Sequence, residues 1–289
     1  MKQITVLSGK GGTGKTTLVA SFAALAQRIV VTDCDVDAPN LHLLLKPEII
    51  QTQEFGGSNL AIIDEAKCIK CGKCEESCRF DAIKDMIVDS VLCEGCGVCA
   101  YVCPAEAIQL KERLSGYAFI SKTDYGLMSH ARLNPREENS GKLVTLVRQN
   151  ARKIAENEGY ELILNDGPPG IGCPVIASIG GVDAGLIVVE PTLSGIHDME
   201  RALALLNHFQ VPPLVYINKY DLDQENTSRI VVFCESNGIE VTGKIPFDSL
   251  VTKAMVVGKS VVEHSPKSMV SKAIAELWTH TLEHLSKRS

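Results

Sequence analysis

Long apolar runs, an excess of basic charge and aromatic side chains are all scarce in this chain of 289 residues. It contains no run of about eighteen apolar residues, so the sequence predicts no transmembrane helix. The formal net charge of −6 argues against a general nucleic-acid-binding protein, because such proteins need a basic face. Aromatic residues make up only 5% of the chain, which leaves little for stacking on bases. We therefore expect neither a membrane nor a nucleic acid as a partner.

The beginning of the chain shows no targeting signal. Met1 to Thr5 leads directly into a β-prone run, which leaves no room for a signal peptide, so a cytoplasmic location is expected. Eleven cysteines in such a chain favour metal binding over disulfides. The length suits one large domain or two modest ones, and the content of 45% hydrophobic residues is typical of a globular protein.

A glycine-rich stretch near the N-terminus fits the phosphate-binding pattern G-x-x-x-x-G-K-[ST]. It lies between a β-prone run at 4–7 and a run of helical composition at 17–26. Strand, glycine-rich turn and helix together predict a loop whose backbone N–H groups bind phosphate at the start of a helix. Lys15 is placed to reach the outer phosphates, and the Thr16 hydroxyl to bind Mg²⁺. The predicted ATP-binding residues of this stretch are Gly9, Lys10, Gly11, Gly12, Thr13, Gly14, Lys15, Thr16 and Thr17.

Lys10 is a second lysine in this loop, where an ordinary P-loop needs no cation. The stretch from Lys10 to Thr17 resembles the deviant Walker A motif K-G-G-x-G-K-T-T, which marks the MinD/ParA/NifH superfamily of dimeric P-loop ATPases, with its Mrp-like branch. The resemblance implies that Lys10 reaches across a dimer interface to the partner's nucleotide, and that hydrolysis requires dimerisation. The dimer is expected to be a homodimer or a heterodimer with a paralogue. The alternative is a solvated loop lysine.

Acidic residues follow two of the expected strands. The run from Asp33 to Asp37 resembles switch I of the superfamily, which implies that Asp35 orients the attacking water and contributes to the Mg²⁺ site, with Asp37 as second choice. The alternative is that these aspartates cap the following helix. Asp166 begins Asp-Gly-Pro-Pro-Gly, which resembles switch II and implies a Walker B-type carboxylate that reaches Mg²⁺. Catalytic roles are thus predicted for Lys10, Lys15, Asp35 and Asp166.

Two later strand ends are candidates for contacts with the base. Asn218 and Lys219 resemble the base-recognising N-[KR] position of the family, and an Asn amide offers a donor and an acceptor to an adenine edge. Pro246 lies in the loop 245–248, which is expected to pack near the base. Ordinary strand ends are the alternative at both places.

Eight cysteines interrupt the alternation of strands and helices between residues 58 and 113. They form two runs of the type C-x₂-C-x₂-C-x₃-C about 25 residues apart, which is the bacterial ferredoxin spacing, and the fourth cysteine of each run serves the other cluster. One predicted [4Fe–4S] cluster has the ligands Cys68, Cys71, Cys74 and Cys103. The second has the ligands Cys78, Cys93, Cys96 and Cys99. Zinc is the alternative metal, but it favours paired C-x₂-C units with a longer gap.

The predicted fold is α/β, a doubly wound and mostly parallel P-loop sheet with a small inserted ferredoxin-like α+β domain. The ATPase domain comprises residues 1–57 and 114–289, and the insert residues 58–113. A hairpin or edge strands are expected at 117–131, a helix at 141–157, and an amphipathic C-terminal helix at 268–285 that docks on the chain's own core. Further strands are expected at 28–33, 161–165, 184–189, 214–218 and 240–245.

Three functions remain open from the sequence. The first is a slow, Mg²⁺-dependent ATPase that couples its nucleotide state to electron transfer through two [4Fe–4S] clusters, with a redox partner that the sequence does not name. The second is an iron–sulfur or metallocofactor assembly ATPase that acts on an apo-protein acceptor, although no C-x-x-C lies outside the insert. The third is a positioning ATPase of the MinD/ParA type, which the acidity of the chain disfavours.

Overall fold

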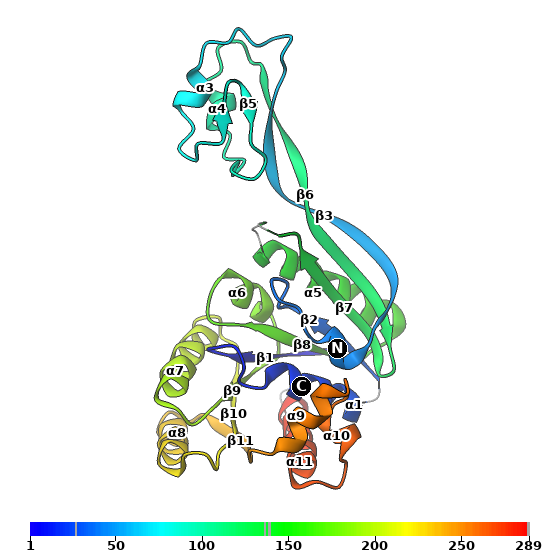
Figure 1. Ribbon diagram of the computed structural model, residues 1–289. Helices are drawn as coiled ribbons and strands as arrows, with labels where there is room; N and C mark the ends of the chain where they lie inside the picture. Colours follow the sequence, from blue (N-terminus) through cyan, green and yellow to red (C-terminus); the bar gives the residue numbers. More distant parts are fainter. Residues whose placement is uncertain (27, 136, 138–139, 288–289) are drawn as a thin grey trace. The chain divides into compact units, whose positions relative to one another are not determined.

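The computed structural model describes residues 1–26, 28–135, 137 and 140–287. The chain divides into two compact units. The first unit comprises Met1–Thr52, Ala118–Arg132 and Ser140–Ser289, and the second comprises Gln53–Tyr117 and Leu133–Asn139. Figure 1 shows the elements of both units, and the predicted insert at 58–113 lies inside the second one.

The first unit is built on a mainly parallel sheet. Its strand order is β11-β10-β9-β1-β8-β2-β7-β6-β3, and the neighbouring strands from β11 to β7 in this order pair in parallel. This agrees with the predicted doubly wound P-loop sheet. The strands are β1 (Lys2–Ser8), β2 (Ile29–Asp33), β3 (Glu48–Ile63), β6 (Ile108–Thr123), β7 (Gly126–Leu133), β8 (Leu162–Pro169), β9 (Ala184–Val189), β10 (Pro213–Asn218) and β11 (Glu240–Ile245).

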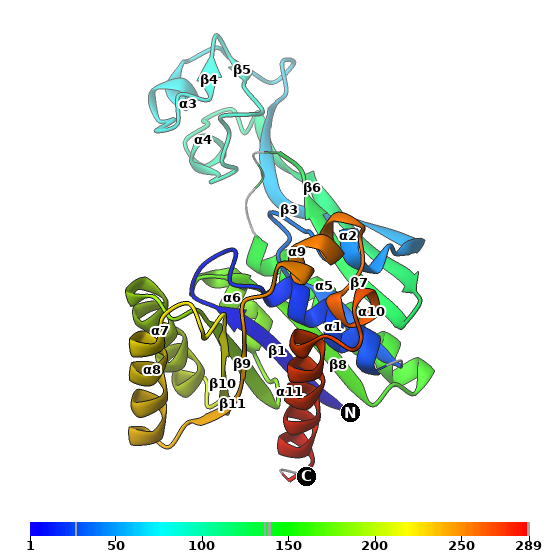
Figure 2. The ribbon, with the colours of Figure 1, turned by 60° about the horizontal axis from the view of Figure 1, so that its bottom comes forward.

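Helices lie on both faces of the sheet (Figure 2). They are α1 (Lys15–Ala26), α2 (His42–Leu45), α5 (Ser140–Glu158), α6 (Cys173–Ile179), α7 (Leu193–His208), α8 (Gln224–Ser236), α9 (Ser249–Val256), α10 (Val261–His264) and α11 (Met269–Ser286). Because side chains alternate along a strand, Ile4 and Val6 of β1 belong to one core and Leu7 to the other. Helices α1 and α11 cover the first core, and α6, α7 and α8 cover the second.

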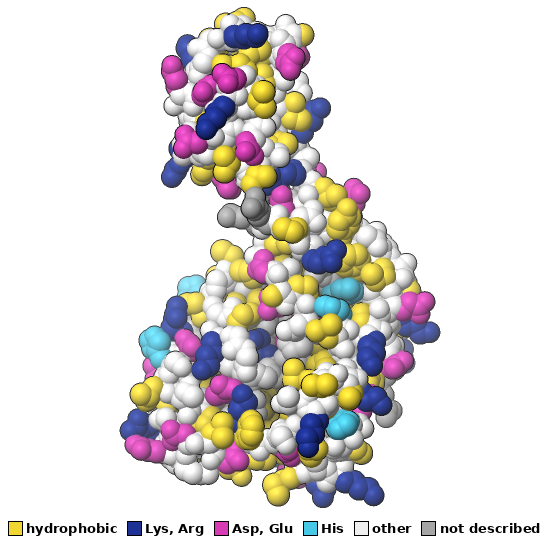
Figure 3. Space-filling model, viewed as in Figure 1, with side chains coloured by type: hydrophobic (Ala, Val, Ile, Leu, Met, Phe, Trp, Pro, Cys, Tyr) yellow, Lys and Arg dark blue, Asp and Glu magenta, His cyan; other side chains and the backbone are white. Residues whose placement is uncertain are grey.

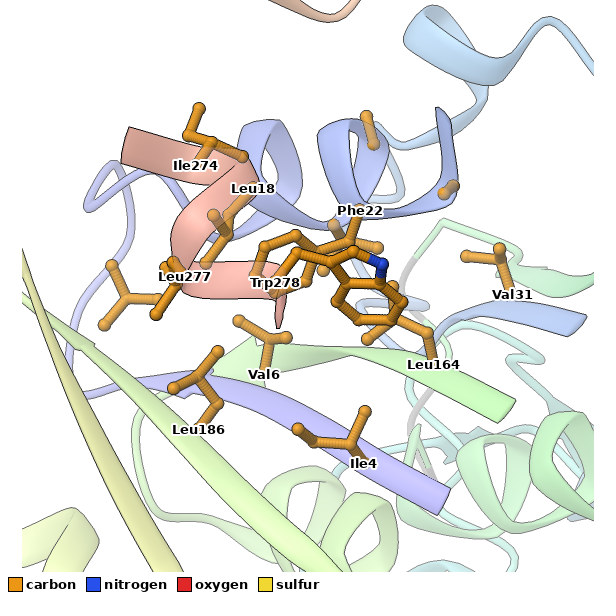
Figure 4. Close-up of a cluster of buried hydrophobic side chains, with 14 of the residues drawn as sticks. Ile4, Val6, Leu18, Phe22, Val31, Leu164, Leu186, Ile274, Leu277 and Trp278 are labelled. Carbon is orange, nitrogen blue, oxygen red and sulfur yellow. The ribbon is translucent and has the colours of Figure 1, made fainter. Parts of the chain in front are cut away.

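The C-terminal helix α11 packs on the sheet, as the amphipathic pattern predicted. Its Ile274, Leu277 and Trp278 are buried against α1 and the strands (Figure 4). The rings of Phe22 and Trp278 lie 4.7 Å apart between their centroids. Among the described residues, no helix has both the length and the apolar character needed to span a membrane.

The second unit contains the cysteine-rich segment. The long strands β3 and β6 run into it, and between them lie α3 (Lys73–Glu76), β4 (Ile83–Lys84), β5 (Ile87–Val88) and α4 (Val98–Tyr101). Strands β4 and β5 pair antiparallel. The small core combines cysteines with a few apolar side chains such as Ile83 and Ile108. The residues around 134 also belong to this unit, because the Asn134 N–H donates to the Ser115 carbonyl at 2.9 Å.

Candidate functional site

A cavity of about 310 Å³ lies at the carboxyl ends of the strands in the first unit. The glycine-rich loop between β1 and α1 forms one side of it, and the ends of β10 and β11 form another. Of the predicted ATP-binding and catalytic residues, the lining includes Gly11, Gly12, Gly14, Lys15, Thr16, Thr17, Asp35, Asn218, Lys219 and Pro246. The carboxyl edge of such a sheet is where ligands bind in doubly wound folds.

The turn of the loop depends on glycine at two positions with left-handed backbone. Gly12 has φ of +79° and Gly14 has φ of +97°. A Cβ at Gly14 would lie 2.6 Å from the side-chain nitrogen of Asn218. That amide donates to the Thr13 carbonyl at 2.8 Å, so Asn218 holds the loop in the ligand-free chain.

Lys15 points inward at the start of α1. Its Nζ donates to the Ser8 Oγ at 2.8 Å, and its side chain is buried. Burial lowers the pKa of Lys15, and the carboxylates of Asp166, Asp35 and Asp33 oppose this shift. The sequence predicted Lys15 but not Ser8, whose place at the end of β1 was its only signal.

Two buried aspartates stand side by side on β2 and β8. Asp33 and Asp166 are register partners, and both are almost fully buried. Neither carboxylate oxygen of Asp166 makes a hydrogen bond of good geometry among the described residues, although the Thr16 hydroxyl lies near enough to oppose the rise of its pKa. Burial raises the pKa of Asp166 to about 7 and that of Asp33 well above its usual range. An orphaned buried carboxylate of this kind fits a hydrated cation.

Capping of the turn after β2 falls to Asp33, which the sequence analysis did not single out. Its carboxylate accepts from the N–H groups of Asp35, Asn40 and Leu41 at 3.1, 3.2 and 3.1 Å. Asp35 lines the cavity and is half-buried, whereas Asp37 is exposed. Asp33 thus holds the turn before α2, whose N-cap residue Leu41 makes no side-chain cap hydrogen bond. The role predicted for Asp35 stays a prediction.

Lys10 points away from the cavity that the described residues of its own chain form. Its Nζ lies 3.8 Å from the Glu190 carboxylate and 3.5 and 3.4 Å from the hydroxyls of Thr192 and Ser194. Glu190 also binds Lys219 at 2.5 Å. The only signal of this link in the sequence is an acidic residue after β9. Gly9 is tightly packed here, because a Cβ would lie 2.0 Å from the Asp198 Cβ.

The base-contact candidates line the same cavity. Asn218 ends β10, Lys219 follows it, and Pro246 follows β11. Phe247, which the sequence analysis did not single out, also lines the cavity and is 53% exposed. Its backbone N–H donates to the Asp221 carboxylate at 2.7 Å.

In the second unit, the eight cysteines separate into two groups of four. One cavity is lined by Cys68, Cys71, Cys74 and Cys103. A second cavity is lined by Cys78, Cys93, Cys96 and Cys99. Cys78 and Cys103, the last cysteines of the two runs, each line the cavity of the other run and are here called the crossing cysteines. Each accepts a backbone hydrogen bond at an equivalent position: the Ala82 N–H donates to the Cys78 Sγ at 3.4 Å, and the Ala107 N–H to the Cys103 Sγ at 3.3 Å.

The arrangement of possible ligands also bears on sites for a single metal ion. In the described part of the chain, no three His, Cys, Asp or Glu side chains are grouped so as to hold one metal ion. In a cubane each thiolate binds a different iron, so the four sulfur atoms stand farther apart than around a single ion. The clusters therefore stay a prediction. Cys173, at the start of α6, is exposed and lines neither cysteine cavity.

The chain is similar to a known family and to known proteins over most of its length. The family model described as the CobQ/CobB/MinD/ParA nucleotide binding domain matches residues 4–261. An uncharacterised protein of Methanocaldococcus jannaschii is 35% identical over 286 residues, which cover 98% of this chain and 97% of that protein. Because so much of both chains is aligned, the match extends through the cysteine-rich unit.

Solved structures share the fold. The cell division ATPase MinD of Pyrococcus furiosus has a TM-score of 0.61 at 16% identity, with 98% of this chain and 99% of that chain covered. The Mg-ADP complex of MinD from Pyrococcus horikoshii has a TM-score of 0.62 at 16% identity, with 100% and 98% covered. The chain therefore belongs to the CobQ/CobB/MinD/ParA nucleotide-binding domain family and is a P-loop ATPase.

Proposed function

We propose that this ATPase couples its nucleotide state to electron transfer through two [4Fe–4S] clusters bound by the second unit. The observation that carries the proposal is the division of eight cysteines between two cavities, four to each. The division follows the crossed ligand sets of the ferredoxin pattern, in which the last cysteine of each run joins the other set.

The nucleotide half of the proposal rests on the fit of the cavity. A volume of about 310 Å³ and a lining of loop N–H groups suit a nucleotide with its phosphates at the start of α1. Lys15 supplies a buried positive charge toward the outer phosphates. Thr16 and the unpartnered Asp166 are the residues that would hold Mg²⁺, which when bound neutralises charge on the phosphates. Asp35, on the cavity wall, is the residue proposed to orient the attacking water.

We propose that the chain dimerises, because of where Lys10 lies. In the single chain the Lys10 ammonium pairs with Glu190, and Lys10 is not among the described residues that line the cavity. The superfamily motif implies that this lysine exchanges that pairing for the nucleotide of a second copy. We propose a homodimer or a heterodimer with a paralogue.

The cluster half of the proposal rests on the second unit's own chemistry. Thiolates in the spacing of a ferredoxin hold cubane clusters, which pass single electrons. The N–H groups of Ala82 and Ala107 approach the sulfur atoms of the two crossing cysteines, and hydrogen bonds to sulfur are among the factors that set a cluster's potential.

A positioning ATPase is the second candidate, and the fold shared with MinD favours it. That function would show as stimulation of hydrolysis by vesicles or by DNA. Assembly of metallocofactors is the third, and it would show as transfer of iron and sulfide from the reconstituted chain to an apo-ferredoxin. If the clusters stay bound and neither vesicles nor DNA stimulate hydrolysis, the results support electron transfer.

The test begins with anaerobic reconstitution and analysis of iron and sulfide. Two clusters predict about eight of each per chain. A Cys71→Ser variant should lose one cluster, a Cys96→Ser variant the other, and a Cys173→Ser control neither. A chain without bound iron and sulfide contradicts the proposal.

An EPR redox titration with and without Mg-ATP then tests the coupling. A shift of about 60 mV in either one-electron couple corresponds to about 1.4 kcal/mol of coupling free energy. If a chain that binds both clusters and Mg-ATP shows unchanged potentials, the nucleotide does not control electron transfer and the proposed coupling is wrong. Cluster transfer to an acceptor would then be the function to test.

A further inference from the structure

The two cysteine runs of the second unit form an internal repeat whose members differ at the exposed cysteine. Cys71 in the first run and Cys96 in the second are the middle ligands, and both are exposed. Their flanking residues occupy equivalent positions. The first run reads Cys68-Ile69-Lys70-Cys71-Gly72-Lys73-Cys74, and the second reads Cys93-Glu94-Gly95-Cys96-Gly97-Val98-Cys99.

These differences give the two exposed cysteines different surroundings. Ile69, Lys70 and Lys73 stand where the second run has Glu94, Gly95 and Val98, so the charge of the three positions is +2 in one run and −1 in the other. Figure 3 shows basic, acidic and hydrophobic side chains together on the surface of this unit, so its net charge alone would not reveal the asymmetry.

Lys70 occupies a position that normally suits glycine. Its φ is +54°, and the equivalent Gly95 has φ of +64°. A left-handed backbone costs a residue with a Cβ about 1 kcal/mol, which glycine avoids. At this position the second run has glycine, so the lysine adds a positive charge that the backbone conformation does not require.

The two lysines beside Cys71 make no close ion pair with a carboxylate of the described chain. Lys70 and Lys73 are exposed, and among the described residues neither lies within ion-pair distance of a carboxylate, whereas Lys67 is 3.9 Å from Asp64. The described lining of the first cavity includes Lys73 and no carboxylate. In the second cavity Arg79 and Glu94 offset each other.

An exposed apolar side chain lies next to these lysines in the sequence. Ile69 is 65% exposed beside Cys71, whereas its equivalent in the other run is the acidic Glu94. Glu75, which lies nearby in sequence, accepts from the Asp85 N–H at 3.2 Å and so faces the turn between β4 and β5. Positive charge beside an exposed apolar side chain favours encounter with an acidic partner through electrostatic complementarity.

We propose that Ile69, Lys70 and Lys73 form the docking face for an acidic one-electron carrier, which exchanges electrons with the cluster held by Cys71. This inference rests on the proposed function, because it needs the cluster. One electron leaves the reduced cluster and enters the carrier, with no other group transferred. The lysines raise the rate of encounter through charge attraction that salt screens.

The experiment measures electron transfer from the dithionite-reduced, reconstituted full chain to flavodoxin, an acidic carrier, and to cytochrome c, a basic one. The variant Lys70→Gly/Lys73→Val copies the second run and keeps a residue that tolerates the left-handed turn. The control Lys84→Gln/Lys111→Gln removes the same amount of charge from the same unit, at residues that line neither cysteine cavity.

We expect the second-order rate constant with flavodoxin at low ionic strength to fall about tenfold in Lys70→Gly/Lys73→Val, with a weaker dependence on salt. The control and the reaction with cytochrome c should not slow. Equal rates for the variant and the control overturn the docking face. So does an equal loss with both carriers, which would indicate damage to the cluster.

Analysis of iron and sulfide separates the two levels of failure. If the wild-type chain and both variants hold their clusters and yet react alike, the docking face is wrong and the proposed function stands. If the wild-type chain holds no cluster, the proposed function fails and this inference fails with it.

Discussion

At the scale of single residues, the loop of the nucleotide site is fixed by close approaches that forbid a side chain. Gly14 is limited both by its φ of +97° and by the Asn218 amide 2.6 Å from a Cβ built on it. Gly11, three residues earlier in the same loop, has no atom within 4 Å of such a Cβ. The two glycines therefore have different costs of substitution.

Replacing Gly14 by Ala should lower the free energy of unfolding of the nucleotide-free chain by about 1–3 kcal/mol, because the backbone is strained and Asn218 must move. Gly11→Ala should change it by less than about 0.5 kcal/mol. Urea denaturation of the two variants checks this. Equal losses would show that space around the loop does not set the cost.

His130 is a second case in which burial fixes the behaviour of one side chain. Its Nε2 lies 2.8 Å from the Ser121 Oγ, and its ring is 5.1 Å from that of Phe119. Burial lowers the pKa of His130 to about 4, with a smaller contribution from His42. The unfolded chain therefore takes up this proton at a higher pH than the folded chain does.

Stability should consequently fall as the pH drops from about 6.5 toward 4, since the unfolded state binds more protons in that window. The part due to His130 is about 2.5 kcal/mol at pH 4.5, and it should be absent in His130→Gln. Denaturation at pH 7 and at pH 4.5 measures it, with His208→Gln as an exposed control. A pH slope in His130→Gln as steep as that of wild type would contradict the assignment.

At the scale of elements, local patterns predicted what local chemistry decides. The P-loop, the strands at 184–189 and 240–245, and the amphipathic character of α11 follow from spacing that a short window contains. The pairing of Glu190 with Lys10 and Lys219 could not be predicted, because it joins residues from three separate elements. The role of Asp33 in holding the turn after β2 could not be told apart from the roles of Asp35 and Asp37, because three aspartates in one short run give the same signal.

The place of α11 yields a prediction about the whole fold of the first unit. Trp278 is only 6% exposed and packs on Phe22, whereas Leu282, one turn further on, is 39% exposed. Trp278→Ala should lower the free energy of unfolding by about 3–5 kcal/mol, because it leaves a cavity, and Leu282→Ala by less than about 1 kcal/mol. Urea denaturation of the two variants, followed by far-UV circular dichroism because the first lacks the only tryptophan, measures both losses. A small loss in Trp278→Ala would mean that α11 is not part of the cooperative core.

At the scale of the whole molecule, the two units have different sources of stability. The first has extensive cores on both faces of its sheet. The second is small, and its core combines cysteines with few apolar residues. Small units with so little apolar core usually depend on metals or disulfides. The sequence predicted cluster ligands here from cysteine spacing and an insert at 58–113, whereas in the structure the corresponding unit extends over 53–117 because it includes parts of the long strands β3 and β6.

Removal of iron should therefore loosen the second unit and spare the first. We expect chelator-treated protein to be cleaved by trypsin within residues 53–117 at least about tenfold faster than the reconstituted protein, because proteolysis follows local opening. Mass spectrometry locates the cuts, and renewed reconstitution should restore resistance. Equal cleavage with and without iron would show that the unit is stable through its polypeptide alone.

The course of β3 and β6 has a consequence for the history of the chain. These strands are neighbours in the sheet, so the polypeptide leaves the ATPase unit and returns to it at the same edge. Everything between them is added without changing the order of the other strands. A single insertion of coding sequence into an ancestral hairpin is therefore enough to join the two units, and a single deletion that restores a short turn there is enough to separate them again.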